Sequence, residues 1–588
     1  MSNEKIDLIA SLAQNEIVEF TGNEDEIDSS APVTKINLTK KNYQLNDYIV
    51  VISSPFEIAP QQKTKIKCQN MLILNKGNVS NLEIEGSLNV KNTILQMKDC
   101  IIHSSNDSSQ GIVVVTSSNL YMENCEVYDG NIPGFYIEQN SKAEIESCHI
   151  HDVNHTLFAT SLSKSVSINN SKFHNSPHNG VHSYQTDILI TNSEFYSTSY
   201  PSISASNSKC TIKNTTVYDI EQNGISLENI KNGEICDCTL HDVKATGISA
   251  NRNSVCKFHD NKFASIGGNA FHITDQSHVE IYNNSITDCL YPAFAILLQC
   301  TAQVHDNTVH NCDLSGMCIR NATEVSLYDN EFIDINDCGV SISDTEKAII
   351  HDNKIKNCKV AAIECYNNSQ VQAENNQIDG IGQCAFLSYA KAKIVCKDND
   401  VSNVKQCFAR LLCHGSGEFT NNKITNCPKL IDDSTTGDYF FEDNSDFENV
   451  TNMESKFKEE GSKIILHKKN TSNVKNLCLN CQKNERDSYF HPCGHQVYCH
   501  KCAYEALEKK ECCVLCRFPI EKILDGFHID DEESRCIICR ENPVDSIILP
   551  CGHIGFCSEC LVKWFVDNNS CPFCRTEHSF FKKIIDLD

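Results

Sequence analysis

An asparagine recurs at a strict interval of 23 residues through the second half of the repetitive region, and this repeat constrains the fold more than any other feature. The eight positions are Asn261, Asn284, Asn307, Asn330, Asn353, Asn376, Asn399 and Asn422. An apolar residue stands two places after each, as at Phe263 and Ile286. Counting back in steps of 22 to 25 residues, the same position holds Cys, Ser or Thr as far as Cys100. We call this position the slot, and it marks fifteen successive repeats.

A period near 23 residues with short apolar runs and no helical period is typical of a parallel β-helix. Leucine-rich repeats have a similar length, but they need a fixed leucine pattern that this Asn- and Ile-rich stretch lacks. The sequence therefore predicts an all-β fold, a right-handed single-stranded parallel β-helix of about 15 regular coils of about 23 residues each. Coils stacked about 4.8 Å apart would make a rod roughly 70 Å long.

The slot residues would then form a column along the rod. Identical amides in register can hydrogen-bond from coil to coil, so we interpret the asparagines as a structural ladder. Asp or Asn also recurs four places after the slot, for example at Asp129, Asp152 and Asp219. This recurrence is too regular for a catalytic site, and a turn-forming role explains it.

Changes in composition divide the chain into five segments. We predict an N-terminal lead or cap over residues 1–42, the β-helix over 43–443 and a charged linker over 444–476. Two small cysteine-rich domains follow, over 477–525 and over 534–588 with its C-terminal tail. We call these two domains finger one and finger two.

Finger two contains four pairs of metal ligands in quick succession. They are Cys536 and Cys539, Cys551 and His553, Cys557 and Cys560, and Cys571 and Cys574. Zn²⁺ takes four thiolate or imidazole ligands at the corners of a tetrahedron, so eight ligands predict two zinc ions. The pairs could fill the two sites in series or interleaved. Zinc binding worth about 10–16 kcal/mol per site can fold a segment whose core is too small to fold unaided.

The order of seven cysteines and one histidine resembles the RING finger of ubiquitin ligases such as Cbl, over residues 536–575. In that family the pairs interleave, which implies one zinc site of Cys536, Cys539, Cys557 and Cys560 and another of Cys551, His553, Cys571 and Cys574. The resemblance also implies contacts with a ubiquitin-conjugating enzyme or its bound ubiquitin, made by Ile538, Trp564, Pro572 and Arg575. Trp564 is the only tryptophan of the chain, and Trp and Arg dominate binding hot spots.

Finger one repeats the ligand spacing of finger two. Its predicted zinc ligands are Cys478, Cys481, Cys499 and Cys502 for one site, and Cys493, His495, Cys513 and Cys516 for the other. Four zinc ions per chain are therefore expected. Asn480, Ala506 and Val514 stand where finger two has Ile538, Trp564 and Pro572, and only Arg517 parallels Arg575. We predict that finger one docks a conjugating enzyme poorly and serves as a brace or a dimer contact.

An apolar tail follows each finger, around Ile523 in the first and Phe580 in the second. In some RING ligases such a tail pairs two RINGs, so a dimer through the fingers is a further prediction.

Composition narrows the partners and the compartment. The formal net charge of -26 argues against nucleic-acid binding, which needs a basic surface. No apolar run approaches the roughly 18 residues of a membrane span, and the first residues lack a signal-peptide core, so we expect no membrane insertion and no secretion. Of the 35 cysteines, those in the rod are expected to be buried thiols in a reducing compartment, the cytoplasm or the nucleus.

The predicted function is that of a RING-type E3 ubiquitin ligase, with ubiquitin-conjugating enzyme, ubiquitin and a protein substrate as partners. The β-helix would recruit the substrate, and finger two would dock the ubiquitin-charged conjugating enzyme. Catalysis would come from positioning the reactants, without a covalent intermediate. One alternative is a non-catalytic scaffold stapled by zinc. Another is a carbohydrate-binding or carbohydrate-cleaving β-helix, but cleavage needs paired carboxylates or a calcium-binding acidic cluster. The only adjacent Asp pair within the predicted β-helix, Asp432 and Asp433, lies at its very end.

A column of rings suggests where a substrate would bind. Three residues after the slot, six successive coils carry Tyr128, His151, His174, Tyr196, Tyr218 and His241. Alternation along a strand turns this column outward, and an exposed stripe about 25 Å long would suit a protein strand or a glycan. The alternative is that the rings only stack to stabilise the sheet. Against that alternative, the same column in the C-terminal coils holds no ring pattern.

Overall fold

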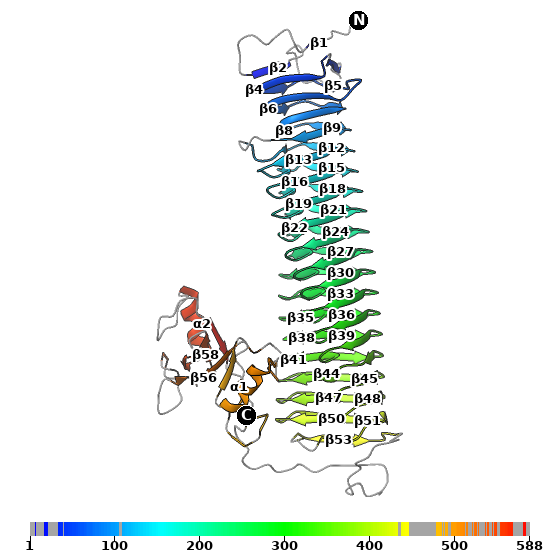
Figure 1. Ribbon diagram of the computed structural model, residues 1–588, viewed down its shortest axis with the longest axis vertical. Helices are drawn as coiled ribbons and strands as arrows, with labels where there is room; N and C mark the ends of the chain where they lie inside the picture. Colours follow the sequence, from blue (N-terminus) through cyan, green and yellow to red (C-terminus); the bar gives the residue numbers. More distant parts are fainter. Residues whose placement is uncertain are drawn as a thin grey trace.

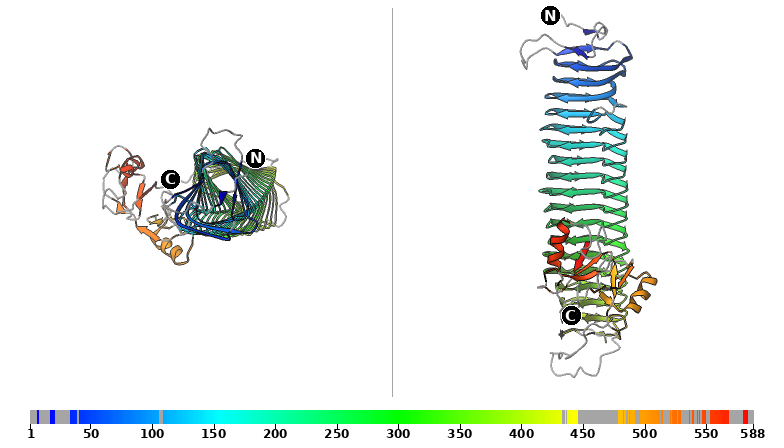
Figure 2. Two further views of the ribbon diagram at one scale, coloured as in Figure 1. Left: turned by 90° about the horizontal axis from the view of Figure 1, so that it is seen from above. Right: turned by 90° about the vertical axis from the view of Figure 1, so that its left-hand side faces the viewer.

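The computed structural model describes residues 33–445 except 39, 105–108, 433–434 and 436, most of 478–528 and 536–567, and short strands at 6–7, 17–20 and 580–583. The long segment forms a straight rod, and both fingers lie beside its C-terminal coils (Figures 1 and 2). In the part of the chain that the structure describes, no helix has both the length and the apolar character needed to cross a membrane.

The rod is a parallel β-solenoid of about 17 turns of about 23 residues each, which confirms the predicted fold class. Most coils contain three short strands, as in β15 (Lys142–Glu146), β16 (His149–Val153) and β17 (Phe158–Ser161). Each strand pairs in parallel with its equivalent in the next coil, here β18 (Ser165–Asn169), β19 (Lys172–Ser176) and β20 (Val181–Tyr184). The first coils are less regular, because β4 (Asn42–Ile52), β6 (Thr64–Ile73) and β8 (Leu82–Lys91) are long strands whose pairing shifts register midway.

Alternation along the strands fills the interior of the rod. Inward residues such as Phe173 and Phe195 are fully buried and stack from coil to coil with ring centroids 4.8 Å apart. The rod cysteines are thiols, and all are buried except Cys413, which is half-buried. Burial raises the pKa of thiols such as Cys365 to about 12, so these side chains behave as small apolar groups, as predicted.

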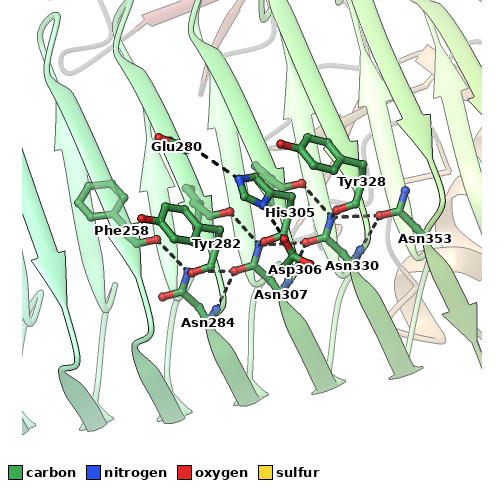
Figure 3. A network of polar contacts seen from close by, with 12 residues as sticks. Phe258, Glu280, Tyr282, Asn284, His305, Asp306, Asn307, Tyr328, Asn330 and Asn353 are labelled. Atoms are coloured by element: carbon green, nitrogen blue, oxygen red, sulfur yellow. Dashed lines mark hydrogen bonds and ion pairs between the residues drawn. The ribbon is translucent and has the colours of Figure 1, made fainter.

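The asparagine ladder is present and continuous. The backbone N–H of Asn284 donates to Oδ1 of Asn307 at 3.0 Å, and the Asn284 side-chain amide donates to the same oxygen at 2.9 Å (Figure 3). The amide also donates to the Phe258 carbonyl of the coil before at 3.0 Å. This pattern continues beyond the predicted eight members to Asn444, which accepts from Asn422 at 2.9 Å. The ladder thus satisfies buried amides along the rod, which confirms its structural role.

The Asp or Asn four places after the slot has the predicted role of bending the chain. Asp129, Asp152 and Asp219 have φ values of 59°, 52° and 55°. Asp and Asn adopt this left-handed conformation more readily than other residues with a side chain. Their recurrence is therefore explained by backbone geometry.

Each finger combines a small sheet with one helix. Finger one contains β54 (Ser488–His491), β55 (Gln496–Tyr498), α1 (His500–Glu508) and β56 (Lys522–Asp525). Finger two contains β58 (Ser546–Leu549), β59 (His553–Phe556), α2 (Ser558–Asp567) and β60 (Phe580–Lys583), and β57 (Phe527–His528) joins its sheet. The apolar tails form β56 and β60, which pair with β54 and β58 of their own fingers.

Candidate metal centres and docking faces of the two fingers

Four cysteines of finger one converge from two separate turns of the chain. Cys478 and Cys481 lie on one tight knuckle, whereas Cys499 and Cys502 lie at the start of α1. Their sulfur atoms all lie within 4.8 Å of one another, and Cys481 Sγ is 3.8 Å from Cys499 Sγ. Thiolates 2.3 Å from a tetrahedral zinc stand about 3.8 Å apart, so the cluster fits Zn²⁺.

The backbone of the knuckle also favours the thiolate form of Cys481. Backbone N–H groups of Asn484 and Lys483 point at the Cys481 sulfur and lower its pKa to about 6. Burial instead raises the pKa of Cys502 to about 12, so metal binding must displace a proton from that thiol.

Finger two reproduces this arrangement at positions 58 residues further along the chain. The sulfurs of Cys536, Cys539, Cys557 and Cys560 lie within 4.8 Å of one another. Cys539 Sγ is 3.8 Å from Cys557 Sγ, the same separation as in finger one. In both clusters the first and third ligand pairs come together, which is the interleaved arrangement.

An asparagine beside each cluster was not predicted from the sequence. Asn484 Nδ2 lies 3.7 Å from Cys499 Sγ, and Asn542 Nδ2 lies 3.8 Å from Cys557 Sγ. The backbone carbonyl oxygen of each asparagine also accepts a hydrogen bond from the backbone N–H of the first ligand, at 2.7 Å for Cys478 and 2.8 Å for Cys536. Such contacts orient the ligands of a metal site. The signal was available, because Asn follows the second Cys by three residues in both fingers.

The second predicted zinc site of each finger falls largely outside the described residues. Cys493, His495, Cys516, Cys551, Cys571 and Cys574 are not described, and neither is the side chain of His553, although its backbone lies in β59. Cys513 is described and fully buried. These ligand assignments remain predictions.

The predicted docking residues of finger two are described in part. Ile538 lies on the first ligand knuckle with 47% of its surface exposed. Trp564 lies on α2 and is half-buried. Pro572 and Arg575 lie outside the described residues.

Finger one presents the equivalent surface to the rod. We define the rod–finger cluster as the buried side chains that join them, of which the rod supplies Cys338, Ala361, Tyr366, Cys384, Leu387, Tyr389, Ala390 and Cys407, and finger one supplies Phe490, Val497, Ala503, Ala506, Cys513, Ile520 and Ile523. Ala506, the counterpart of Trp564, is 1% exposed. Val514, the counterpart of Pro572, also packs on this cluster, as does Leu479, next to Asn480. Asn480 itself is exposed.

Polar contacts cross the same boundary. The Tyr389 hydroxyl lies 3.4 Å from the Val514 carbonyl oxygen and 3.1 Å from Oε1 of Glu364. Glu364 is fully buried and also accepts a hydrogen bond from Ser341 Oγ at 2.8 Å. A buried carboxylate is costly unless it is hydrogen-bonded, so this network is specific to the covered part of the rod.

The strands beneath finger one differ from those elsewhere. β44 (Ala361–Tyr366) and β47 (Cys384–Tyr389) are buried at every residue, whereas β20 alternates between buried and exposed. Tyr184 of β20 is 42% exposed, but Tyr366, in the same outward column, is 2% exposed. The sequence carries this signal, because a run without polar alternation indicates a strand buried on both faces.

The predicted ring column stacks as a continuous series along β13 (Glu126–Gly130), β16, β19, β22 (Glu194–Thr198), β25 (Thr216–Ile220) and β28 (Thr239–Val243). Neighbouring rings lie 4.4 to 5.3 Å apart, and all six side chains are half-buried. Their role in binding a substrate remains a prediction.

A second ring column removes the argument against a purely structural role for the first. The C-terminal coils do carry a ring column, but on the preceding strand, where His259, Tyr282, His305, Tyr328 and His351 stack at 4.7 to 5.1 Å. Stacking therefore serves both halves of the rod, and this favours a structural role for rings in general.

Comparison with known proteins agrees with this architecture. A family model described as a right-handed β-helix region matches residues 65–187 and 246–400. A model for the C3HC4-type zinc finger, or RING finger, matches residues 474–523 and 532–580. A third model, described as a periplasmic copper-binding protein, matches residues 127–289. The chain therefore combines a right-handed β-helix region with two RING fingers.

Curated relatives match over the finger region. The chain is 34% identical over 79 residues to a probable E3 ubiquitin-protein ligase, LUL1, of Arabidopsis thaliana, which is 13% of this chain and 20% of that protein. It is 43% identical over 58 residues to the E3 ubiquitin-protein ligase rnf8-A of Xenopus laevis, 10% of this chain and 11% of that protein. The fingers are thus related to those of ubiquitin ligases, whereas the chain spans only a small share of these relatives.

Solved structures resemble the rod weakly. The catalytic unit of an alpha-1,3-glucanase from Streptomyces thermodiastaticus matches with a TM-score of 0.27 and 9% identity, over 61% of this chain and 63% of that one. A mannuronan C-5 epimerase module from Azotobacter vinelandii matches with a TM-score of 0.15 and 12% identity, over 64% of this chain and 90% of that one.

Proposed function

We propose that this protein is a RING-type E3 ubiquitin ligase in which finger two alone docks the ubiquitin-charged conjugating enzyme. The relationship of both fingers to those of ubiquitin ligases supports the activity. The difference between the two docking faces supports the assignment to finger two.

One observation carries this assignment. The position that holds Trp564 on α2 holds Ala506 on α1, and Ala506 is 1% exposed within the rod–finger cluster. A conjugating enzyme could reach this face only after finger one leaves the rod. Ile538 of finger two is 47% exposed, and within the described residues the rod–finger cluster includes no residue of finger two.

In this proposal finger two acts by positioning. Ile538 and Trp564 would anchor the conjugating enzyme through apolar contact, and Pro572 would extend this surface. Arg575 would hold the ubiquitin thioester in its reactive geometry, as the resemblance to active RING fingers implies. Holding two reactants in place accelerates their reaction without a covalent enzyme intermediate.

Zinc would have a structural role in both fingers. We propose four ions per chain, two in each finger, with the two described four-cysteine clusters holding one each. A bound Zn²⁺ would tie the knuckle that carries Ile538 to the start of α2, which carries Trp564. The docking residues would keep their spacing because the metal joins the elements that carry them.

The rod would recruit the protein substrate, and its ring column of half-buried Tyr and His side chains is the proposed face for this contact. We also propose that the protein works in the cytoplasm or the nucleus, where the many buried thiols of the rod would remain reduced.

An autoubiquitination assay with a panel of conjugating enzymes tests the function. The full chain should form ubiquitin conjugates with at least one member of the panel, and Trp564→Ala should abolish or strongly reduce them. Asn480→Ala is the matched control, because it alters the corresponding knuckle of finger one and should leave activity unchanged. A chain that is inactive with every conjugating enzyme would instead be a zinc-stapled scaffold.

A further inference from the structure

Three imidazoles meet on the outward face of the rod, far from the fingers in the chain. His149 and His151 lie two residues apart on β16, so they point to the same side of the sheet. His174 lies on β19, directly opposite His151 in the neighbouring coil. One ring nitrogen from each of the three lies within 4.8 Å of the others.

The nitrogens face one another closely. His149 Nε2 lies 2.7 Å from His174 Nε2, and the rings of His149 and His151 have centroids 4.1 Å apart. A carboxylate stands at the same place, because Glu126 Oε1 lies 3.0 Å from His151 Nε2 and 3.9 Å from His149 Nδ1. Three imidazoles and one carboxylate make a four-ligand set of the type that divalent transition metals use.

A second layer of contacts orients His151. Its Nδ1 lies 2.7 Å from Oδ2 of Asp152, and Asn175 Nδ2 donates to the other oxygen of Asp152 at 2.9 Å. A carboxylate that accepts from Nδ1 leaves Nε2, which faces Glu126 Oε1 at 3.0 Å, as the ligand atom of a neutral imidazole. Metal-binding histidines usually have a partner of this kind on the nitrogen that does not bind the metal.

Ring stacking does not account for His149. The stack uses the position three residues after the slot, where His151 and His174 lie. His149 lies one residue after the slot, and the same position in the adjacent coils holds Glu126 and Lys172. The third imidazole is therefore an addition to the stack that places a third nitrogen beside the other two.

We propose that His149, His151 and His174, with Glu126 as the fourth ligand, form a binding site for a borderline divalent transition-metal ion such as Zn²⁺, Co²⁺ or Ni²⁺. The His149 side chain is 42% exposed, which gives an ion access from solvent. The site joins three consecutive coils, β13, β16 and β19. Burial lowers the pKa of His149 and of His174, and this favours the neutral imidazoles that a metal requires.

Cobalt uptake by the full chain tests the proposal, after four equivalents of zinc per chain have been supplied to fill the thiolate-containing sites of the fingers. Added Co²⁺ should bind with one further equivalent, which gives visible d–d absorption without a thiolate-to-cobalt band. His149→Lys should remove this equivalent, and it is compatible with the fold because Lys172 occupies the same position in the next coil. His241→Ala is the matched control, since His241 stacks in the same column and contacts Asp242 at 2.7 Å without a third imidazole.

A second variant tests the orienting carboxylate. Asp152→Asn should weaken cobalt binding by about 10- to 100-fold, the usual effect of losing such a contact, whereas Asp242→Asn should leave it unchanged. Equal cobalt binding by the wild-type and His149→Lys chains would overturn the proposal. These measurements need no ubiquitin transfer, so their outcome is separate from that of the ligase assay.

Discussion

Finger one and finger two share a ligand frame but differ in what covers their docking faces. Equivalent cysteines lie 58 residues apart, and both clusters have the same 3.8 Å sulfur separation. Ala506 of finger one belongs to the rod–finger cluster and Val514 packs on it, whereas within the described residues the cluster includes no residue of finger two. The comparison shows the same ligand frame in a finger that packs against the rod and in a finger whose described residues take no part in that packing.

The small side chain of Ala506 allows close packing in the rod–finger cluster. α1 buries Cys502, Ala503 and Ala506 on one face, and Ala lets a helix approach its neighbour closely. A tryptophan at the same position would overfill this buried contact. Of the three positions at which finger one departs from active RING fingers, Ala506 belongs to the rod–finger cluster and Val514 packs on it, whereas Asn480 is exposed.

Removal of zinc is expected to have the largest effect on both fingers. The zinc-loaded His149→Lys chain, which lacks the proposed rod site, should contain near four zinc ions by elemental analysis. Chelation should unfold both fingers and abolish ubiquitin transfer, because their small cores depend on the metal. The rod should keep its β-sheet circular dichroism, since its ladder and core contain no metal ligand of the fingers. If the β-sheet circular dichroism were lost when the fingers unfold, the rod–finger cluster, and not the asparagine ladder, would be what stabilises the rod.

Loss of the docking anchor should come next in size. Trp564→Ala or Ile538→Ala should reduce the rate of ubiquitin transfer by about thirtyfold or more, since a buried anchor is commonly worth about 2 kcal/mol. Zinc content should not change. Full activity in both variants would place the docking surface elsewhere.

A larger side chain in the rod–finger cluster should weaken the packing of finger one on the rod. Ala506→Trp is expected to cost about 1–3 kcal/mol, because overpacking a close contact forces neighbouring side chains and backbone to shift. Hydrogen exchange should then rise across α1 and across the outward residues of β44 and β47. Trp564→Ala is the control, and it should leave exchange in these strands unaltered. Unchanged protection in Ala506→Trp would contradict the packing described for the rod–finger cluster.

The smallest expected effect concerns the polar contact between Tyr389 of the rod and Val514 of finger one. Tyr389→Phe removes the hydroxyl that lies beside Glu364 and the Val514 carbonyl, at a cost of about 1–3 kcal/mol for the buried carboxylate left with fewer partners. Local hydrogen exchange near β47 should increase, whereas Tyr184→Phe on the open part of the rod should change nothing. Identical exchange in the two variants would show that the hydroxyl does not contribute.

The fold of the rod was predictable because the 23-residue repeat fixes which residues lie above one another. The slot predicted the ladder at Asn261 through Asn422, and only the last member, Asn444, was missed because it follows at an interval of 22 residues. The four-cysteine clusters were likewise predictable, since the spacing of their knuckles and the family resemblance together implied the interleaved pairing.

The rod–finger cluster and the group of His149, His151 and His174 could not be predicted in the same way. Tyr389 and Val514 are 125 residues apart in sequence, and no periodicity connects them. The lack of polar alternation in β44 and β47 signals a covered face, but it does not identify what covers it. The contact between His149 and His174 depends on side-chain directions in neighbouring coils, which the repeat alone does not specify.

The stoichiometry of conjugating-enzyme binding tests the central claim most directly. Isothermal titration of the zinc-loaded full chain with an active conjugating enzyme should give one bound enzyme per chain. Trp564→Ala should abolish this binding, and Asn480→Ala should preserve it. Two enzymes per chain, or binding that survives Trp564→Ala, would show that the rod does not close finger one and would contradict the account.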